Sequence, residues 1–323
     1  MVSEEEQQDA ILCDVRAAGT SHIWRAVPFT RSAFNSRNAM DRETRIAAWQ
    51  WLGRDDDLRK LLPVILGDLQ SRGLPKVRST FTLGLHKVSD QWVFCGDKGS
   101  LIGDTYYEGS TGPLVYLDPK REHPRLAISL SVPAGADLRD AISSLVPALN
   151  KEEAIWPIIG WYLASPLKPL FEINGLRFPV LNMFGTKGSG KTSLIQRIFM
   201  PLLGQLDPRS YDAGTTRFVI LSLLGSANSV PIAFSEFRFS SSREFIRYVL
   251  LSYDTGHDPR GRANQTTQDY PLSAPFSVDG EDAISDPAAR ERIISINLDP
   301  ATIAEGSSAY TAFNNLRSAK LTD

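Results

Sequence analysis

Residues 185 to 192 have the types and spacing of a phosphate-binding loop, since Gly-Thr-Lys-Gly-Ser-Gly-Lys-Thr fits the pattern G-x-x-x-x-G-K-[ST] in full. Glycines allow tight turns that point backbone N–H groups at a phosphate chain. Lys191 is expected to reach the β- and γ-phosphates, and Thr192 to bind Mg²⁺. The sequence therefore predicts a site for ATP and Mg²⁺ formed by Gly185, Thr186, Lys187, Gly188, Ser189, Gly190, Lys191, Thr192 and Ser193.

The segments on either side of this loop have the patterns that such a loop requires. The apolar run Phe178–Phe184 suits a buried strand, and Ser193–Phe199 has apolar residues at helical spacing. A strand, a glycine-rich loop and a helix in this order are the context that supports a phosphate-binding loop. The helix N-terminus is expected to add partial positive charge at the phosphates.

A phosphate-loop ATPase also needs an acidic residue at the end of a second strand beside the loop. The best match is Ile-Ala-Phe-Ser-Glu-Phe-Arg at Ile232–Arg238. Glu236 is predicted to orient and deprotonate the attacking water and to lie near the metal. Ser235 stands where an aspartate is usual and would hold Mg²⁺ through a bound water without adding charge. The pattern therefore favours nucleotide binding more strongly than hydrolysis. The alternative is that Glu236 is a surface carboxylate.

Two arginines precede the last predicted strand, Ile293–Leu298. Arg290 and Arg292 end a predicted helix, which suits an arginine finger that reaches into a neighbouring subunit's site and neutralises transition-state charge. The alternative is that one or both solvate the helix C-terminus and complement its dipole.

Bulk composition indicates a soluble protein of one large or two medium domains. The chain has 323 residues, 42% hydrophobic and 22% charged, with a net charge of −2. That balance argues against a large nonspecific DNA-binding face but leaves room for a narrow basic pore. Two distant cysteines and four isolated histidines favour neither structural zinc nor disulfides. The polar N-terminus and the absence of a long apolar span predict a cytoplasmic protein with no membrane contact.

The predicted organisation is a mixed α+β domain over residues 1–150 and an α/β phosphate-loop ATPase domain over residues 151–323. The first is expected to be helical over 41–72, with Pro63 bending or splitting the second of its helices, and β-rich over 77–135. Its predicted helices are Asp41–Leu52, Asp56–Gln70 and Leu138–Leu149, and its strands Phe81–Leu85, Gln91–Phe94, Leu114–Leu117 and Leu126–Val132. No catalytic constellation is found there, so assembly or substrate recruitment is its expected role.

The second domain is predicted to have a central parallel sheet flanked by helices. Besides the elements around the loop, the pattern predicts helices over Ile155–Leu163, Val219–Leu224 and Phe245–Tyr253, and strands over Val230–Phe234 and Pro271–Val278.

Taken together, the phosphate loop, the strand ending in Glu-Phe-Arg, the strand ending Val278-Asp-Gly-Glu281 and the following Arg-x-Arg-Ile-Ile resemble AAA+ ATPases of the superfamily 3 helicase type. More narrowly, they resemble the helicase-like modules that accompany primases in phages, plasmids and other mobile elements. The resemblance covers roughly residues 150 to 300, and Gln91–Asp104 is similar to the β-rich region upstream of some such ATPases.

This resemblance implies several site residues and partners. It implies an Asp-Glu pair where this chain has Ser235 and Glu236, and a sensor residue, often asparagine, matched here by Asp279 or Glu281. It implies a ring, usually a hexamer, that acts on single-stranded or forked DNA with a primase or another replication protein. A pore hairpin near His257–Gln265 would contact DNA through Arg260 and Arg262. The alternative for this segment is an exposed loop with solubilising charge.

Three functions compete at this point. The first is a helicase or translocase that hydrolyses ATP during replication of a phage or mobile element. The second is a signalling or scaffold ATPase in which nucleotide binding controls assembly. Ser235 and the balanced net charge favour this second function. The third is a nucleotide or small-molecule kinase, but Arg197, Arg209 and Arg217 are too scattered to form its lid.

Overall fold

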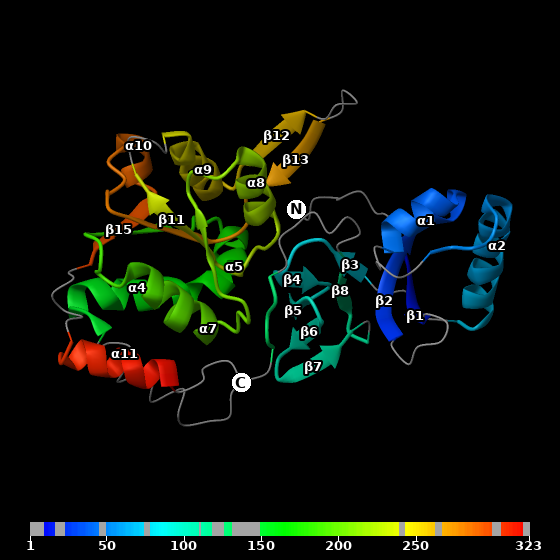
Figure 1. The fold of residues 1–323 in the computed structure, drawn as a ribbon, viewed down its shortest axis with the longest axis horizontal. Coiled ribbons are helices and arrows are strands. Elements are labelled where there is room, and N and C mark those ends of the chain that lie inside the picture. The colour runs from blue at the N-terminus through cyan, green and yellow to red at the C-terminus, as the bar shows by residue number, and fades with distance from the viewer. Residues whose placement is uncertain are drawn as a thin grey trace.

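A computed structural model describes residues 10–16, 23–44, 50–73, 78–109, 111–117, 126–130, 149–238, 243–261, 267–298 and 305–318. The elements follow one another along the longest axis of the molecule (Figure 1). The helices and strands of residues 1–73 lie at one end, a small β-rich unit occupies the middle, and the sheet that carries the phosphate loop lies at the other end.

The phosphate loop follows the fourth strand of a five-stranded parallel sheet ordered β10-β11-β14-β9-β15. Its strands are β9 (Val180–Phe184), β10 (Ser210–Asp212), β11 (Ile232–Phe237), β14 (Phe276–Gly280) and β15 (Ile293–Asn297). The carboxyl ends of parallel strands meet at one edge, so residues after β9, β11 and β14 converge there. The predicted central parallel sheet is thereby confirmed, while the short edge strand β10 was not expected.

Helices cover both faces of this sheet. They are α4 (Glu152–Ala164), α5 (Lys168–Ile173), α6 (Lys191–Leu194), α7 (Met200–Leu202), α8 (Arg217–Gly225), α9 (Arg243–Tyr253), α10 (Pro287–Arg290) and α11 (Ser308–Ser318), with a π-helical stretch at Ile195–Phe199. One core cluster joins Phe234, Phe245 and Phe276 on the side of α8 and α9. The other joins Trp161 and Phe199 on the side of α4. Burial on both faces explains the apolar runs in the strands.

The segment between α9 and β14 differs from the strand predicted over Pro271–Val278. Its first part is an antiparallel hairpin of β12 (His257–Gly261) and β13 (Thr267–Pro271), and β14 begins only at Phe276. Pro271 pairs with His257 across the hairpin, so it ends β13 instead of opening the next strand. The hairpin projects beside α8 and α9 (Figure 1), in the region where the superfamily 3 resemblance implies a hairpin.

The β-rich unit contains β3 (Arg78–Thr80), β4 (Gly84–Val88), β5 (Gln91–Cys95), β6 (Gly99–Ile102), β7 (Thr105–Glu108) and β8 (Leu114–Tyr116). Strands β4 to β7 form an antiparallel meander, and β3 pairs with β8. The strand predicted over Leu126–Val132 is wrong for its described part, because Ile128 makes only an isolated bridge to Gln205. This stretch pairs with the turn after α7, where Ser129 N donates to Gly204 O at 2.7 Å.

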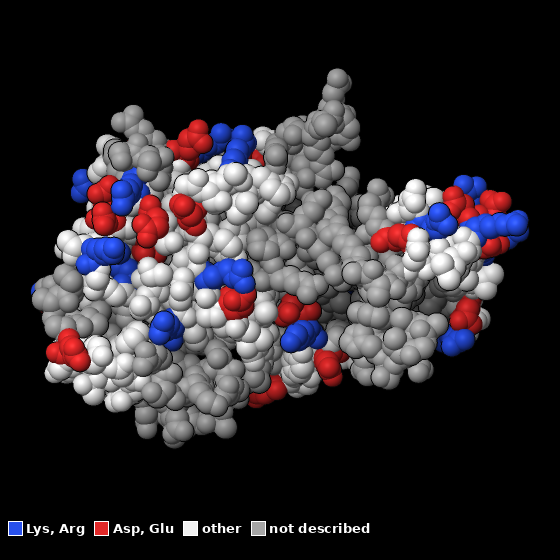
Figure 2. Space-filling model, viewed as in Figure 1, with Lys and Arg blue, Asp and Glu red and all other residues white. Residues whose placement is uncertain are grey.

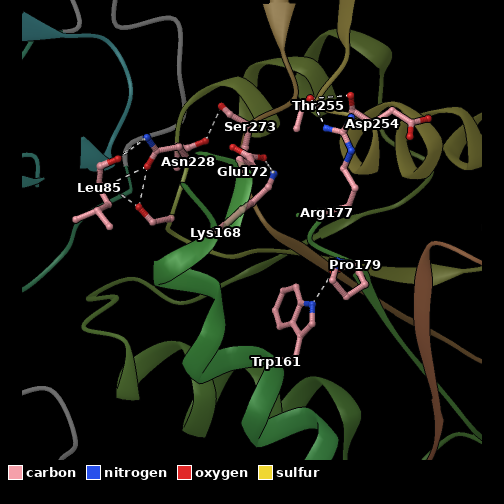
Figure 3. Close-up of polar contacts among 12 residues, drawn as sticks. Leu85, Trp161, Lys168, Glu172, Arg177, Pro179, Asn228, Asp254, Thr255 and Ser273 are labelled. Carbon is pink, nitrogen blue, oxygen red and sulfur yellow. Dashed lines mark hydrogen bonds and ion pairs between the residues drawn. The ribbon is translucent and has the colours of Figure 1, made fainter. Parts of the chain in front are cut away.

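Backbone contacts join this β-rich unit to the loop after α8. Leu83 forms a bridge with Ala227, and the Leu85 amide donates to Asn228 Oδ1 at 2.9 Å (Figure 3). A second contact fixes the segment before β14, since the fully buried Lys168 donates to Ser273 O at 2.6 Å and lies 3.5 Å from Glu172 (Figure 3). Lys168 on α5 therefore fixes the position of the loop that leads into β14.

The N-terminal elements are β1 (Ala10–Arg16), β2 (Ile23–Thr30), a 3₁₀ turn (Arg31–Asn35), α1 (Arg37–Thr44) and α2 (Asp55–Ser71). The antiparallel pair β1–β2 was not predicted. The predicted helix over Asp41–Leu52 is wrong at both ends, because α1 begins at Arg37 and residues 50–54 are not helical. The Asp41 carboxylate instead accepts from Trp51 N at 3.0 Å.

The second predicted helix of this region is confirmed as α2, with its three aspartates in the first turn. Pro63 lies within α2 without splitting it. The helix predicted over Leu138–Leu149 lies outside the described residues except for its last one.

Candidate nucleotide-binding site

The phosphate loop turns sharply between β9 and α6, close to the end of β15. Gly185 has a φ of +150°, and a Cβ there would lie 2.5 Å from Leu298 O, so the close approach of β15 requires glycine. Thr186, Lys187 and Gly188 are exposed, Ser189 is buried, and Gly190 precedes the first residue of α6. The exposed segment is therefore the part of the loop that a phosphate chain could contact.

Lys191 lies folded into the loop. Its ammonium donates to Gly185 O at 2.7 Å, Thr186 O at 3.1 Å and Ser189 Oγ at 2.9 Å, which uses all three of its protons. Burial lowers the pKa of Lys191, and the carboxylates of Asp279, Glu281 and Glu236 oppose that shift. Three acids from the ends of β11 and β14 thus act electrostatically on the lysine of the loop.

Thr192 and Asp279 connect the loop to the neighbouring strand β14. The Thr192 hydroxyl donates to Asp279 Oδ2 at 3.2 Å. Asp279 is only 3% exposed, and its other oxygen, Oδ1, is buried with no hydrogen-bond partner among the described residues. Burial raises the pKa of Asp279 to about 6 against the opposing effects of Thr192 and Lys191, while the charge of Glu236 adds to the rise.

Glu236 has an unusual backbone conformation. Its φ is +59°, the left-handed region that non-glycine residues rarely adopt, and the pairing of β11 with β14 shifts register between Phe234 and Phe237. Such a bulge re-aims a side chain, and strained backbone is common at functional sites. A Cβ on Gly280 would lie 2.1 Å from Phe237 O, so β14 accommodates the bulge only because glycine stands there.

The remaining predicted acidic and polar residues lie around this edge. Ser235 is half-buried, and its carbonyl accepts from Ala213 N at 2.9 Å. Glu281 is exposed and lies 3.9 Å from Arg238. Ser193 is half-buried in the first turn of α6. Among the described residues, no group of three or more His, Cys, Asp or Glu is arranged to hold a metal by itself.

The residues at the loop nevertheless fit a magnesium ion bound together with a nucleotide. Mg²⁺ prefers oxygen ligands, keeps several waters and is held in proteins by one or two groups plus substrate phosphates. Thr192 offers a hydroxyl beside the buried carboxylate of Asp279, whose Oδ1 lacks a partner among the described residues. A cation with its bound waters would satisfy that oxygen.

Comparison with known proteins gives a fold likeness only. No family model matches the sequence, and no curated protein matches it. Among solved structures, the active helicase Cch of SCCmec type IV is similar over 94% of this chain and 54% of its own, at a TM-score of 0.56 and 15% identity. The chain has a helicase-like fold. It spans about half the length of that helicase.

Two further solved structures are more distantly similar to this chain. An inhibitor-bound JCV helicase matches 58% of this chain and 53% of its own at a TM-score of 0.37 and 14% identity. The C-terminal region of NrS-1 matches 80% and 67% at a TM-score of 0.34 and 12% identity.

The two predicted finger arginines lie at the opposite end of this helicase-like sheet from the phosphate loop. The Arg292 carbonyl accepts from Val180 N, at the start of β9, whereas the loop follows the end of β9. Arg292 is held within its own chain, because Nη1 donates to Ala288 O at 2.6 Å and the guanidinium lies 5.7 Å from the ring centre of Tyr253. Arg290, at the end of α10, is exposed.

At the root of the β12–β13 hairpin, a buried carboxylate holds two arginines. Asp258 is fully buried, and its Oδ1 accepts from Arg217 at 2.5 Å and from Arg247 at 2.9 Å. Arg217 also donates to Pro259 O at 3.1 Å. This cluster was not predicted, because its members come from α8, α9 and β12 and share no local motif. Arg260 lies on β12 opposite Gln268, and Arg262 lies outside the described residues.

Surface charge is mixed on the face that Figure 2 shows, where Lys and Arg lie among Asp and Glu over the described residues. No helix among the described residues is long and apolar enough to cross a membrane.

Proposed function

We propose that this chain binds Mg²⁺-ATP at the phosphate loop and hydrolyses it. The observation that carries the proposal is the joint placement of Lys191, Thr192 and Asp279 at the carboxyl edge of a parallel sheet, with Thr192 hydrogen-bonded to the buried acid. Phosphates would take over the ammonium of Lys191 from its carbonyl acceptors in the loop. Mg²⁺ would neutralise the phosphate charge, and Thr192 would hold it.

Glu236 is proposed as the residue that orients and deprotonates the attacking water. Its carboxylate is exposed and is carried by the bulge at the end of β11. A general base of this kind contributes about 10²- to 10⁴-fold in rate. Asp279 and Glu281 are the two residues that match the sensor position implied by the superfamily 3 resemblance.

A homo-oligomeric ring, with a hexamer as the expected form, would complete the site. Arg290 and Arg292 lie at the start of β15 and β9, separated from the phosphate loop by the length of a five-residue strand, about 17 Å. Neither arginine can reach the phosphate loop of its own subunit, so an arginine finger at this position could act only in the site of a neighbouring subunit. Because Arg292 is engaged within its own chain and Arg290 is exposed, Arg290 is the better candidate.

We propose that the protein translocates along single-stranded or forked DNA. The hairpin β12–β13 carries Arg260, and Arg262 follows it in sequence, so a ring would present several such cations to one strand. The helicase-like fold supports this reading. We assign the protein to replication of a phage or mobile element, with a primase or another replication protein as partner. Residues 1–150 are proposed to serve assembly or recruitment of DNA.

Ser235 supports a second candidate, a nucleotide-gated scaffold with slow or no turnover. An uncharged residue at this strand end would weaken the hold on Mg²⁺ if nothing else replaced the missing acid. The two candidates make different predictions for turnover in the presence of DNA.

The deciding experiment is ATP hydrolysis with and without single-stranded DNA by wild type, Lys191→Ala and Glu236→Gln. A motor should show DNA-stimulated turnover that both variants lose, with Glu236→Gln still binding nucleotide. Nucleotide binding that Lys191→Ala abolishes, without turnover in wild type under any condition, would instead support the scaffold. Absence of nucleotide binding in wild type would refute both.

The ring can be tested by mixing two inactive variants, Lys191→Ala and Arg290→Ala. If Arg290 acts across a subunit boundary, some interfaces of a mixed ring combine an intact loop with an intact arginine, and part of the activity returns. The matched control mixture combines Lys191→Ala with Arg292→Ala. No recovery in the first mixture would remove Arg290 from the site.

A further inference from the structure

The hydrogen bond from Thr192 identifies an acid on a different strand from the one that the motif pattern implies. In the expected arrangement, the acid at the end of β11 belongs to the metal's water shell, and that position is Ser235. In this structure the acceptor of the Thr192 hydroxyl is Asp279, at the end of β14. The metal-binding threonine is therefore coupled to a carboxylate one strand away from the expected one.

We infer that Asp279 is the acid of the Mg²⁺ water shell and replaces the carboxylate that Ser235 lacks. The inference rests on the proposed binding of Mg²⁺-ATP. It gives Asp279 a role as a positioning group for the cation and its waters, in place of a sensor of the nucleotide phosphates.

Sheet register explains how the two positions can exchange this role. Phe234 pairs with Val278 in the last regular pair before the register shifts, and Ser235 and Asp279 are the residues that follow this pair on the two neighbouring strands. Strand β14 lies directly beside β9, whereas β11 is separated from β9 by β14. Adjacent strands are about 4.8 Å apart, so the acid has moved one strand closer to the loop.

Another aspartate at this edge is less suitable. Asp212, at the end of β10, pairs with Ser235 but lies on the far side of β11 from the phosphate loop. Three strand spacings separate β10 from β9, about 14 Å, and the Asp212 carboxylate accepts from Gly214 N at 2.7 Å. Asp212 is thus a matched aspartate for a control.

Charge also favours a cation beside Asp279 over a phosphate. A sensor contacts the γ-phosphate, and an ionised carboxylate in that position would be repelled by the negative charge of the phosphate. The orphaned Oδ1 of Asp279 is an acceptor that a phosphate oxygen cannot satisfy, whereas a metal-bound water donates to it. An asparagine, the frequent sensor residue, would instead offer a donor to the phosphate.

The test measures how much Mg²⁺ tightens the binding of a fluorescent ATP analogue, as the ratio of dissociation constants in EDTA and in Mg²⁺. The proteins are wild type, Asp279→Asn, the control Asp212→Asn, and the double variant Ser235→Asp/Asp279→Asn. Loss of an outer-shell partner typically costs about 10- to 100-fold in metal affinity. We expect Asp279→Asn to lose about that factor of the Mg²⁺ effect without a loss of affinity in EDTA. Asp212→Asn should match wild type, and the double variant should recover the Mg²⁺ effect.

Two results would overturn the inference while leaving the proposed function intact. One is a full Mg²⁺ effect in Asp279→Asn, which is the result that a sensor role predicts. The other is a double variant that recovers nothing although its affinity in EDTA shows an intact loop. Wild-type protein that binds no nucleotide with or without Mg²⁺ would refute the proposed function itself, so the two failures are distinguishable.

Discussion

Replacing Asp279 by asparagine should stabilise the nucleotide-free protein at neutral pH. Its carboxyl is 3% exposed and has one oxygen without a partner among the described residues, so ionisation in the folded state is costly. Burial raises its pKa from an ordinary value of 3.8 to about 6. Asparagine has nearly the same shape, keeps an oxygen to accept the Thr192 hydroxyl, and carries no charge at any pH.

The expected size and pH range follow from this shift. Below pH 3.8 Asp279 is protonated in both the folded and the unfolded chain, so it carries no ionisation penalty there. As pH rises the unfolded chain ionises first, and folding stability falls until the folded carboxyl also ionises near pH 6. A shift of roughly 2 units corresponds to about 3 kcal/mol. Asp279→Asn should therefore gain up to about 3 kcal/mol above pH 7 and little near pH 4.

Urea unfolding followed by circular dichroism between pH 4 and pH 8, without nucleotide or metal, measures this difference. Asp212→Asn is the control, because an exposed edge residue should change stability by less than about 0.5 kcal/mol at every pH. A gain that does not depend on pH, or a loss of stability at pH 8, would refute the reasoning. The first would mean that the carboxyl is not desolvated, and the second that its charge is needed in the nucleotide-free fold.

Three further predictions concern packing and reactivity. Gly280→Ala should destabilise the protein by about 2 kcal/mol or more, because its Cβ would lie 2.1 Å from a main-chain carbonyl of β11. Gly160→Ala, at an exposed position of α4 where a Cβ would have nothing within 4 Å, should instead stabilise the protein by up to about 1 kcal/mol in thermal unfolding. Asp258→Ala should lower the free energy of unfolding in urea by about 1 to 3 kcal/mol, because it removes a fully buried acceptor shared by two half-exposed arginines. Because this acceptor lies at the root of the β12–β13 hairpin, the variant should also show weaker stimulation of ATP hydrolysis by DNA. Burial raises the pKa of Cys95 to about 12, so at pH 8 only Cys13 should react with iodoacetamide until the protein is unfolded; equal reaction of both thiols would contradict this.

The parts of the fold that sequence predicted well are those in which one local signal suffices. The phosphate loop is a contiguous motif, and α8, α9 and β15 have apolar spacing set by burial of one face or of a whole strand. The strand predicted over Pro271–Val278 failed because this range joins the last residue of β13, a short loop that contains Leu272 and Ala274, and the first residues of β14. Periodicity alone cannot divide such a run.

The contacts that define the site come from residues distant in sequence, which local patterns do not reveal. Thr192 and Asp279 are 87 positions apart, and their meeting depends on β14 lying between β9 and β11. The same holds for Asp258 with Arg217 and Arg247, which three separate elements bring together. Sequence named Asp279 as a site residue, but its hydrogen-bond partner required the sheet order.

The stability penalty and the proposed metal role of Asp279 are two aspects of one arrangement. A buried carboxyl with an unsatisfied oxygen costs stability in the nucleotide-free protein, and a cation with its waters would remove that cost. Binding of Mg²⁺-ATP should then stabilise wild type by more than Asp279→Asn, because a ligand that binds only the folded state adds stability that increases with its affinity. The serine on β11 does not by itself argue for a protein without turnover, because an acid on the neighbouring strand β14 is hydrogen-bonded to Thr192, the threonine that we propose binds Mg²⁺. If Asp279→Asn abolishes the additional stabilisation by Mg²⁺ and the double variant with Ser235→Asp restores it, the scaffold candidate loses the observation that favoured it.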